Sequence, residues 1–411
     1  MQKILILTIV ICLCACLFVA CDTHEHVCSF GELTITKQPT CTESGQQERV
    51  CSCGEKQTSS ISSTGHSYSP VEILPTATEQ GYTFYQCVKC EHNYKDEYVD
   101  ALGFSSGLAY SVNTDGETCT IIGIGTCADT EISIPEEIDG YIVNAIGNNA
   151  FSNCTNMTRV IIPDSVTIIG EDSFNECNSL RRVTFGENSQ LTTIGEDAFI
   201  NCTSLISITI PVGVTTIESG AFAACYSLVE VYNYSQLNIT KGSNDNGSVA
   251  FLAIDVYTTD EPSKISNVDG AIIYTNSDAV TFVKYFGTAT DIIIPDTVTI
   301  IGNHAFTDCI SLISVTIPAS TTTIAGHAFA YCRNLTSVTF EEDSQLTTIG
   351  FNAFGICINL TDIVIPSNVA IIDVYAFFDC NSLTSITIPS SVISIGACAF
   401  AGCSSLSIVT F

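Results

Sequence analysis

Basic side chains are scarce in this 411-residue chain, and their scarcity excludes two classes of partner. Lys and Arg number 13 against 43 Asp and Glu, which gives a formal net charge of −30. Nucleic acid is excluded because its phosphates need Lys and Arg to displace their counterions. Electrostatic docking on anionic lipid is disfavoured for the same reason. An acidic surface instead suits a soluble extracellular protein, and no D-x-[DN]-x-[DN]-G calcium loop accompanies the carboxylates.

Catalytic motifs are also missing from the sequence. It contains no G-x-S-x-G, H-E-x-x-H or G-x-x-x-x-G-K-[ST] pattern. Histidines are few, and two of the six, His304 and His327, stand at corresponding positions just before an Ala-Phe pair. We expect these two to be solvated positions on short helices. The sequence therefore predicts a protein that is not an enzyme and that needs no catalytic cofactor.

A long apolar run occurs only at the N-terminus. Lys3 followed by the apolar residues 4–20 is typical of a secretory signal peptide, so residues 1–20 are predicted to be removed. The run is short for a membrane-spanning helix, which needs about 20 apolar residues. Residues 17–21 (LFVAC) resemble a bacterial lipobox, which implies acylation of Cys21 and a membrane anchor. Cleavage at Cys16, or secretion without a lipid, are the alternatives.

The sequence does contain one pattern that is repeated nine times. A Phe, usually preceded by Ala, is followed three residues later by Cys and six residues later by Leu or Met. The nine copies are at Phe151, Phe174, Phe199, Phe222, Phe306, Phe329, Phe354, Phe377 and Phe400. Their spacing is 23 or 25 residues, apart from one gap of 84. A fixed period of this length indicates a solenoid, in which each coil buries its apolar side against its neighbours.

The period can be translated into one coil. In the copy at 194–205 the recurrent positions have helical spacing, which predicts a short helix with Ala, Phe and Cys facing inward. Residues 205–211 alternate with period two and end at Pro211, which predicts a short strand. Residues 214–217 return the chain, with a second short strand as an option. Because every coil runs the same way round, successive strands should be parallel.

The consensus I-G-x-x-A-F-x-x-C-x-x-L-x-x-V-x-I-P resembles the leucine-rich repeats of the BspA-like type, found on bacterial cell surfaces and in some parasitic protists. The resemblance covers residues 145–232 and 291–411. It implies an α/β leucine-rich-repeat solenoid of parallel strands and short helices. It also implies a cell-surface location and adhesion to host proteins or other cells. None of the consensus residues is a catalytic residue of the family.

The chain has 22 cysteines, a number that at first suggests a disulfide scaffold. Nine of them, from Cys154 to Cys403, occupy the same repeat position. We expect these nine to form an inner ladder of free thiols that donate weakly to backbone carbonyls. Burial should raise their pKa and make them unreactive. Disulfides between neighbouring coils are the alternative, because adjacent strands lie about 4.8 Å apart.

Residues 21–103 lack the repeat consensus but contain two related modules. Residues 39–45 (PTCTESG) match residues 75–81 (PTATEQG), and the Cys pair of residues 51–53 matches that of residues 87–90. The two modules resemble small Cys/His modules found in tandem on surface proteins of related bacteria. Each has about 36 residues, too few for a sizeable core without a staple.

A metal would provide such a staple. Zinc ligands are expected in the first module at Cys41, Cys51, Cys53 and His66, with Cys28 or His26 as substitutes. The second module offers Cys87, Cys90 and His92. Its site should be incomplete, because Ala77 replaces Cys41. The Cys-x-Cys spacing is tighter than the usual two-residue gap, and disulfides are the natural alternative in a secreted chain.

The rest of the chain divides into four predicted segments. They are a β cap module at 104–144, a first array at 145–232, an insertion at 233–290 and a second array at 291–411. The strand pattern of the cap module recurs inside the insertion, at residues 270–295. Each array therefore should begin with its own cap, as the exposed end of a solenoid requires. Phe411 ends a predicted strand with no cap after it, as in a truncated chain.

Function is expected at the positions that the repeat leaves free. The residues that flank each inward Val or Ile of the longer strand should form one exposed face, rich in Ser and Thr. The distinctive groups on this face are Arg159, Arg182, Glu230, Tyr232 and Asp362. We predict a surface protein that binds a host or cell-surface protein or glycan through this face or the insertion. The alternatives are a structural surface spacer and an enzyme with its site in the insertion.

Overall fold

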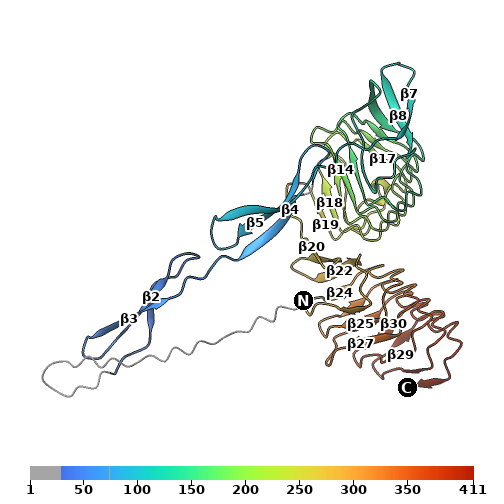
Figure 1. The fold of residues 1–411 in the computed structure, drawn as a ribbon. Coiled ribbons are helices and arrows are strands. Elements are labelled where there is room, and N and C mark those ends of the chain that lie inside the picture. The colour runs from blue at the N-terminus through green and yellow to red at the C-terminus, as the bar shows by residue number, and fades with distance from the viewer. Residues whose placement is uncertain (1–28, 74) are drawn as a thin grey trace. The chain divides into compact units, whose positions relative to one another are not determined.

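The computed structural model describes residues 29–73 and 75–411, which form two compact units (Figure 1). The N-terminal unit ends at Ala101, and the solenoid unit comprises Thr76–Thr78 and Leu102–Phe411. No helix among the described residues could span a membrane. The predicted signal peptide and Cys21 lie outside the described residues, as do His26 and Cys28.

The N-terminal unit consists of two three-stranded antiparallel sheets, one in each module. Module 1 contains β1 (Thr34–Lys37), β2 (Gly45–Val50) and β3 (Lys56–Ile61), and module 2 contains β4 (Tyr68–Ile73), β5 (Gly81–Cys87) and β6 (Asn93–Val99). The central strands start at Gly45 and Gly81, where a Cβ atom would lie 2.6 Å and 2.5 Å from the nitrogens of Pro39 and Pro75. The two modules therefore share one local fold.

The solenoid unit is built from two arrays, each with two parallel ladders. In array 1 the longer strands are β9 (Glu131–Ser133), β12 (Arg159–Ile162), β14 (Arg182–Phe185), β16 (Ser207–Ile210), β18 (Glu230–Asn233) and β19 (Asp255–Tyr257). The return strands are β11 (Tyr141–Ile146), β13 (Ile168–Ile169), β15 (Thr193–Ile194) and β17 (Thr216–Ile217). The second short strand foreseen at 214–217 is therefore present as β17.

Array 2 repeats this plan. Its longer strands are β23 (Asp291–Ile293), β25 (Ser314–Ile317), β27 (Ser337–Phe340) and β29 (Asp362–Ile363), followed by the separate pair β31 (Ser385–Thr387) and β33 (Ile408–Thr410). Its return strands are β24 (Ile300–Ile301), β26 (Thr323–Ile324), β28 (Thr348–Ile349), β30 (Ile371–Ile372) and β32 (Ser394–Ile395). Neighbouring coils pair in parallel in both ladders, as predicted.

Each array opens with an antiparallel hairpin whose second strand joins the return ladder. The hairpin of array 1 pairs β7 (Ala109–Val112) with β8 (Thr118–Gly123), and β10 (Glu137–Ile138) is added beside β11. The hairpin of array 2 pairs β21 (Ala271–Thr275) with β22 (Val280–Tyr285), and β20 (Ile265–Val268) extends it. In each array the hairpin thus lies at the N-terminal edge of the sheet that contains the return strands, next to the first coil.

Part of the stretch between the arrays is itself a coil of array 1. β19 pairs in parallel with β18, and the single helical turn η1 (Asn246–Ser248) replaces the Phe-containing turn of the other coils. The N–H of Phe222 donates to the carbonyl of Gly247 at 2.8 Å, in the position where other coils have Ala or Ser. Residues 243–248 look like a polar loop in the sequence, yet they continue the solenoid.

The short helices predicted for each coil are wrong, because the described chain contains tight turns there instead. Alternate backbone N–H groups bond three residues back, as Cys202 N–H does to the Phe199 carbonyl at 3.1 Å. The N–H groups between them bond forward to the next coil, as Phe199 N–H does to Ala221 O at 2.7 Å. Asp197 and Asn201 have φ of 52° and 61°, which an α-helix does not accommodate. The inward residues thus have helical spacing although they lie in tight turns. These turns are stabilised by hydrogen bonds to the next coil.

Two side-chain ladders fill the interior of the arrays. The repeat phenylalanines are buried, except for the partly buried Phe400, and stack with centroids 4.8–5.3 Å apart, as Phe174 does on Phe199 at 4.9 Å. Beside them, repeat thiols donate to the Phe carbonyl of the preceding coil, as Cys202 does to Phe174 at 3.2 Å. The same bond recurs at Cys177, Cys225, Cys332, Cys357, Cys380 and Cys403. Burial raises the pKa of Cys225 and Cys357 to about 12. The repeat cysteines therefore form a ladder of thiols rather than a disulfide framework.

Candidate functional site

The structure divides the five predicted face residues into two groups. Arg182 and Asp362 are exposed, and Tyr232 is half-buried. Arg159 is only 7% exposed and lies 3.9 Å from Glu131, its neighbour on β9. Glu230 is fully buried. The expectation that all five would be exposed is therefore wrong for Arg159 and Glu230, which face neighbouring structure.

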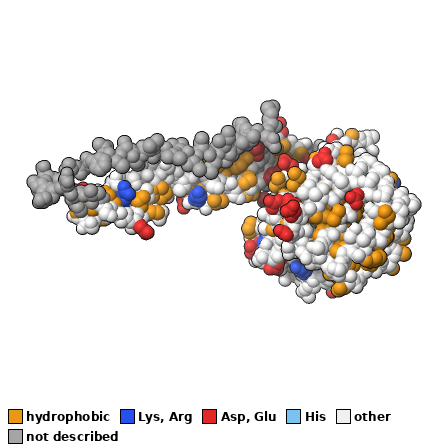
Figure 2. Space-filling view, turned by 90° about the horizontal axis from the view of Figure 1, so that it is seen from below, with side chains coloured by type: hydrophobic (Ala, Val, Ile, Leu, Met, Phe, Trp, Pro, Cys, Tyr) orange, Lys and Arg blue, Asp and Glu red, His pale blue; other side chains and the backbone are white. Residues whose placement is uncertain are grey.

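Asp362 lies in a groove of about 700 Å³ between β27 and β29. Hydroxyl, amide and acidic side chains line much of this groove, including Ser337, Thr339, Glu341, Asp343, Asp362 and Asn368. Three lining residues are acidic and none is Lys or Arg. Figure 2 shows the same imbalance more widely, because acidic side chains gather on the visible face of the solenoid unit and basic ones are sparse. The groove thus combines neutral hydrogen-bonding groups with negative charge.

The groove forms where one coil is two residues longer than its neighbours. The coil from Phe329 to Phe354 has 25 residues instead of 23. β25 and β27 pair at four positions, whereas β27 and β29 pair only at Ser337–Asp362 and Val338–Ile363. Beyond that point the strands separate. Array 1 shows the same local effect after its own 25-residue coil, because β14 and β16 pair at one position while β12 and β14 pair at four.

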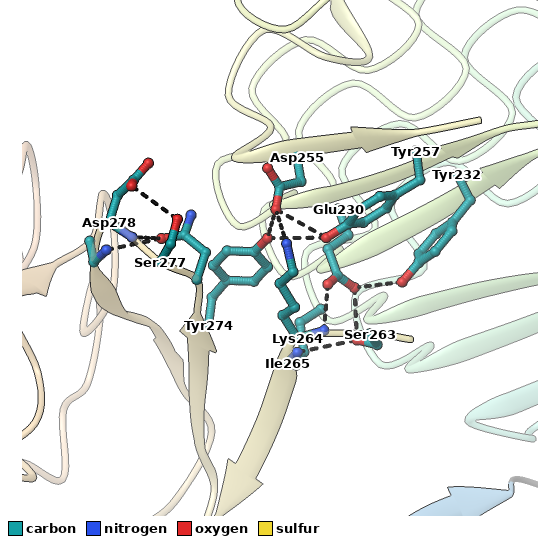
Figure 3. A network of polar contacts seen from close by, with 12 residues as sticks. Glu230, Tyr232, Asp255, Tyr257, Ser263, Lys264, Ile265, Tyr274, Ser277 and Asp278 are labelled. Carbon is teal, nitrogen blue, oxygen red and sulfur yellow. Dashed lines mark hydrogen bonds and ion pairs between the residues drawn. The ribbon is translucent and has the colours of Figure 1, made fainter. Parts of the chain in front are cut away.

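A polar network joins array 1 to the strand that opens array 2 (Figure 3). Glu230 on β18 accepts hydrogen bonds from Ser263 Oγ at 2.7 Å, Lys264 N–H at 2.8 Å and Tyr232 Oη at 3.1 Å. Asp255 on β19 accepts from Lys264 Nζ at 2.9 Å and also from the hydroxyl of Tyr274. These contacts hold the segment before β20 against the sheet of array 1. Both carboxylates therefore have a structural role.

Apolar and aromatic contacts reinforce the same junction. Arg181 lies over the ring of Phe286 at 3.8 Å, and Tyr226 stacks on His304 with centroids 3.9 Å apart. A small buried cluster joins them and contains Val229, Ile272, Tyr274 and Val283. Burial, together with His327 and Lys284, lowers the pKa of His304 to about 3. The prediction of a solvated His304 is therefore wrong.

Four of the seven predicted metal ligands come together in the N-terminal unit. Cys41, His66, Cys87 and Cys90 each offer one ligand atom, and these atoms all lie within 4.8 Å of one another. The sulfurs of Cys41 and Cys87 are 3.8 Å apart, and Cys90 Sγ is 3.4 Å from His66 Nδ1. The group draws on both modules, so the predicted division into one complete and one incomplete site is wrong.

The other three predicted ligands lie outside this group. Cys51 and Cys53 belong to module 1 and are not among the four. His92 is close by, with its ring 4.5 Å from that of His66, but its Nδ1 is paired with Tyr68 Oη at 3.0 Å. His92 thus lies beside the cluster without contributing to it.

The pKa values of the two buried thiols of the cluster, Cys41 and Cys87, are shifted in opposite directions. Burial acts to raise the pKa of Cys87. Hydrogen bonds, mainly from the Lys89 N–H and from His66, outweigh this effect and lower the pKa to about 5. Burial raises the pKa of Cys41, and so do its neighbours Cys90 and Cys87. The group can therefore hold at least one thiolate at neutral pH, the form in which cysteine binds metals.

Comparison with known proteins identifies the repeats. The family model described as "BspA type Leucine rich repeat region (6 copies)" matches residues 126–277 and 279–407. No curated protein matches the chain. Among solved structures, a leucine-rich cell surface protein from Faecalibacterium prausnitzii is 27% identical, with 74% of this chain and 93% of that chain covered and a TM-score of 0.39.

Two further solved structures are similar. A leucine-rich repeat protein from Bacteroides capillosus is 36% identical over 31% of this chain and 94% of that chain, with a TM-score of 0.28. The pneumococcal vaccine antigen PcpA is 16% identical over 75% of this chain and 81% of that chain, with a TM-score of 0.35. Because the family model covers more than half of the sequence, the chain belongs to the BspA-type leucine-rich-repeat family.

Proposed function

We propose that this chain is a non-enzymatic cell-surface protein that binds a partner through the groove between β27 and β29. The signal-like residues 1–20 and the lipobox-like sequence before Cys21 support export and a lipid anchor. The mass of the N-terminal peptide from membrane-extracted protein tests the anchor, because acylation at Cys21 adds the mass of its lipids.

The composition of the groove carries the proposal. Glu341, Asp343 and Asp362 present three carboxylates without a basic residue among the lining groups. The most complementary partner is a protein segment that carries Lys or Arg, because opposite charges increase the rate of encounter and fix its register. Ser and Thr side chains lose little conformational entropy when a partner covers them. The same hydroxyl and amide groups support a glycan as the second candidate.

A charge reversal in the groove tests this function. We expect Asp362→Lys to weaken attachment of the protein to immobilised matrix proteins or cells at least tenfold, while the circular dichroism spectrum stays unchanged. Glu187→Lys is the matched control, because Glu187 is an exposed acid on the corresponding loop of array 1. A glycan array assayed in parallel distinguishes the two ligand classes.

The outcomes separate binding from a structural role. An equal loss of attachment in Asp362→Lys and Glu187→Lys would show that attachment depends on net charge and not on the groove. A wild-type protein that binds no matrix protein, cell or glycan would instead support the spacer function.

A further inference from the structure

The described residues of the N-terminal unit form no hydrophobic core that could hold its sheets together. In the described part of this unit, the buried side chains are Pro75 and the cysteines Cys41, Cys51 and Cys87. β1, β3 and β6 expose nearly every residue. Three-stranded sheets of this size need a hydrophobic face or another stabilising element. Something other than apolar burial must therefore hold the two modules in place.

We propose that Cys41, His66, Cys87 and Cys90 bind one structural Zn²⁺ ion that joins the two modules. One imidazole and three thiolates are ligands that zinc takes in closed tetrahedral sites, and soft sulfur ligands disfavour calcium and magnesium. The ion would connect the turn before β2, the loop before β4 and the turn after β5.

Two distances within the group match those expected around a tetrahedral ion. With Zn–S bonds of about 2.3 Å, two sulfurs of a tetrahedron lie about 3.8 Å apart, and a sulfur and a nitrogen about 3.6 Å apart. The observed separations are 3.8 Å between Cys41 and Cys87 and 3.4 Å between Cys90 and His66. A disulfide would require about 2.05 Å between sulfurs. The side chains are therefore spaced for a shared ion.

The backbone around Cys87 supports the same assignment. The N–H of Lys89 points at Cys87 Sγ at 3.5 Å, inside the Cys-x-x-Cys turn that follows β5. Hydrogen bonds of this kind stabilise a thiolate and orient it toward a metal.

A comparison of the two modules gives independent support. The Gly65 N–H donates to the carbonyl of Cys41 at 3.1 Å, and the corresponding Gly103 N–H donates to that of Ala77 at 2.9 Å. The two backbone pairings are equivalent, but at the second one Ala77 replaces Cys41 and Phe104 replaces His66. Both ligands are thus lost together. This joint loss is expected if Cys41 and His66 serve the Cys-x-x-Cys pair of the module that follows.

Metal content of the full-length protein, measured by inductively coupled plasma mass spectrometry, tests the site. We expect Cys41→Ser and His66→Asn each to lose one equivalent of zinc relative to the wild type. His92→Asn is the matched control and should keep it, because His92 lies beside the cluster and outside it. The readout is the difference in zinc content between the wild type and each variant. Metal bound elsewhere on the protein contributes equally to both and does not affect this difference.

Two measurements on the wild type remain informative if a variant fails to fold. Replacement of zinc by Co²⁺ should give the visible absorption of a tetrahedral, sulfur-rich site. A chelator should make the thiol of Cys90 reactive toward an alkylating agent, whereas exposed Cys398 in array 2 should react with or without it.

Three results would overturn the proposal. They are equal zinc content in the wild type and Cys41→Ser, a bound metal other than zinc, and a metal-free protein whose peptide map shows a disulfide between Cys41 and Cys87.

Discussion

Truncation of Glu230 should destabilise the junction between the arrays far more than truncation of an exposed acid on the same strand face. Glu230 is fully buried and accepts three hydrogen bonds, of which two come from the segment that leads into β20. Glu230→Ala removes all three acceptor contacts at once. Ser263 and the Lys264 backbone would then lose their partner at the point where array 2 begins.

The magnitude follows from the number of bonds and the exposure of the donors. A hydrogen bond to a charged group contributes about 1.5–3 kcal/mol. Three such bonds set an upper range near 5–9 kcal/mol, but Ser263 and Lys264 are exposed and can bond water in the variant. We therefore expect a loss of about 3–5 kcal/mol in the free energy of unfolding. Tyr232→Phe removes one bond only and should cost about 1 kcal/mol.

Urea unfolding and limited proteolysis measure the effect. Asp362→Ala is the control, because Asp362 is exposed at the equivalent strand position and should change stability by less than about 0.5 kcal/mol. In Glu230→Ala we expect faster cleavage between residues 258 and 264 and separate unfolding of the two arrays. A loss as small as that of Asp362→Ala, with a single transition retained, would refute the reasoning.

Three further predictions concern the ladders and the junction. Phe199→Ala removes a buried ring that stacks on both neighbouring coils and should cost about 3–5 kcal/mol in urea unfolding, whereas Phe199→Leu should cost less. The raised pKa of Cys225, about 12, means that the folded protein holds this proton more tightly than the unfolded chain, so stability should fall as pH rises from about 9 to 12. Cys225→Ala should make this alkaline slope shallower by about 1.4 kcal/mol per pH unit. The lowered pKa of His304, about 3, implies the reverse: stability is present above about pH 6.5 and is lost as pH falls toward 3, and His304→Phe should flatten this acid limb in pH-dependent unfolding.

The sequence predicts the solenoid correctly because its signal recurs nine times. Period, parallel strands and inward cysteines all follow from that repetition, and the thiol ladder confirms the expected role of the cysteines. The helices could not be predicted correctly, because inward spacing is the same for a helix and for turns bonded between coils. The choice depends on hydrogen bonds to residues more than 20 positions away, such as that from Phe199 to Ala221.

The candidate sites were harder to predict, because each depends on a partner from another segment. Strand alternation places Glu230 outward, yet residues 263–264 cover it. The sequence pointed to Cys and His side chains of this unit, but not to their grouping, because Cys41 and His66 lie beside the Cys-x-x-Cys turn of the next module. The joint change to Ala77 and Phe104 was the signal that could have revealed this grouping.

One position in the repeat differs between the covered part of array 1 and the solvated part of array 2. The residues before β16, β18 and β19 of array 1 are Ile206, Val229 and Ile254, and these pack at the junction with β21 and β22, whereas Thr130 and Thr158 precede β9 and β12. The equivalent residues of array 2 include Thr336 and Thr361, whose hydroxyls donate to carbonyls of the preceding coils. Ile206, Val229 and Ile254 thus contribute to an interface, whereas the threonines satisfy their own polar groups and leave the edge in water. The groove of array 2, which Thr336 and Thr361 help to line, therefore lies on a face that is open to solvent.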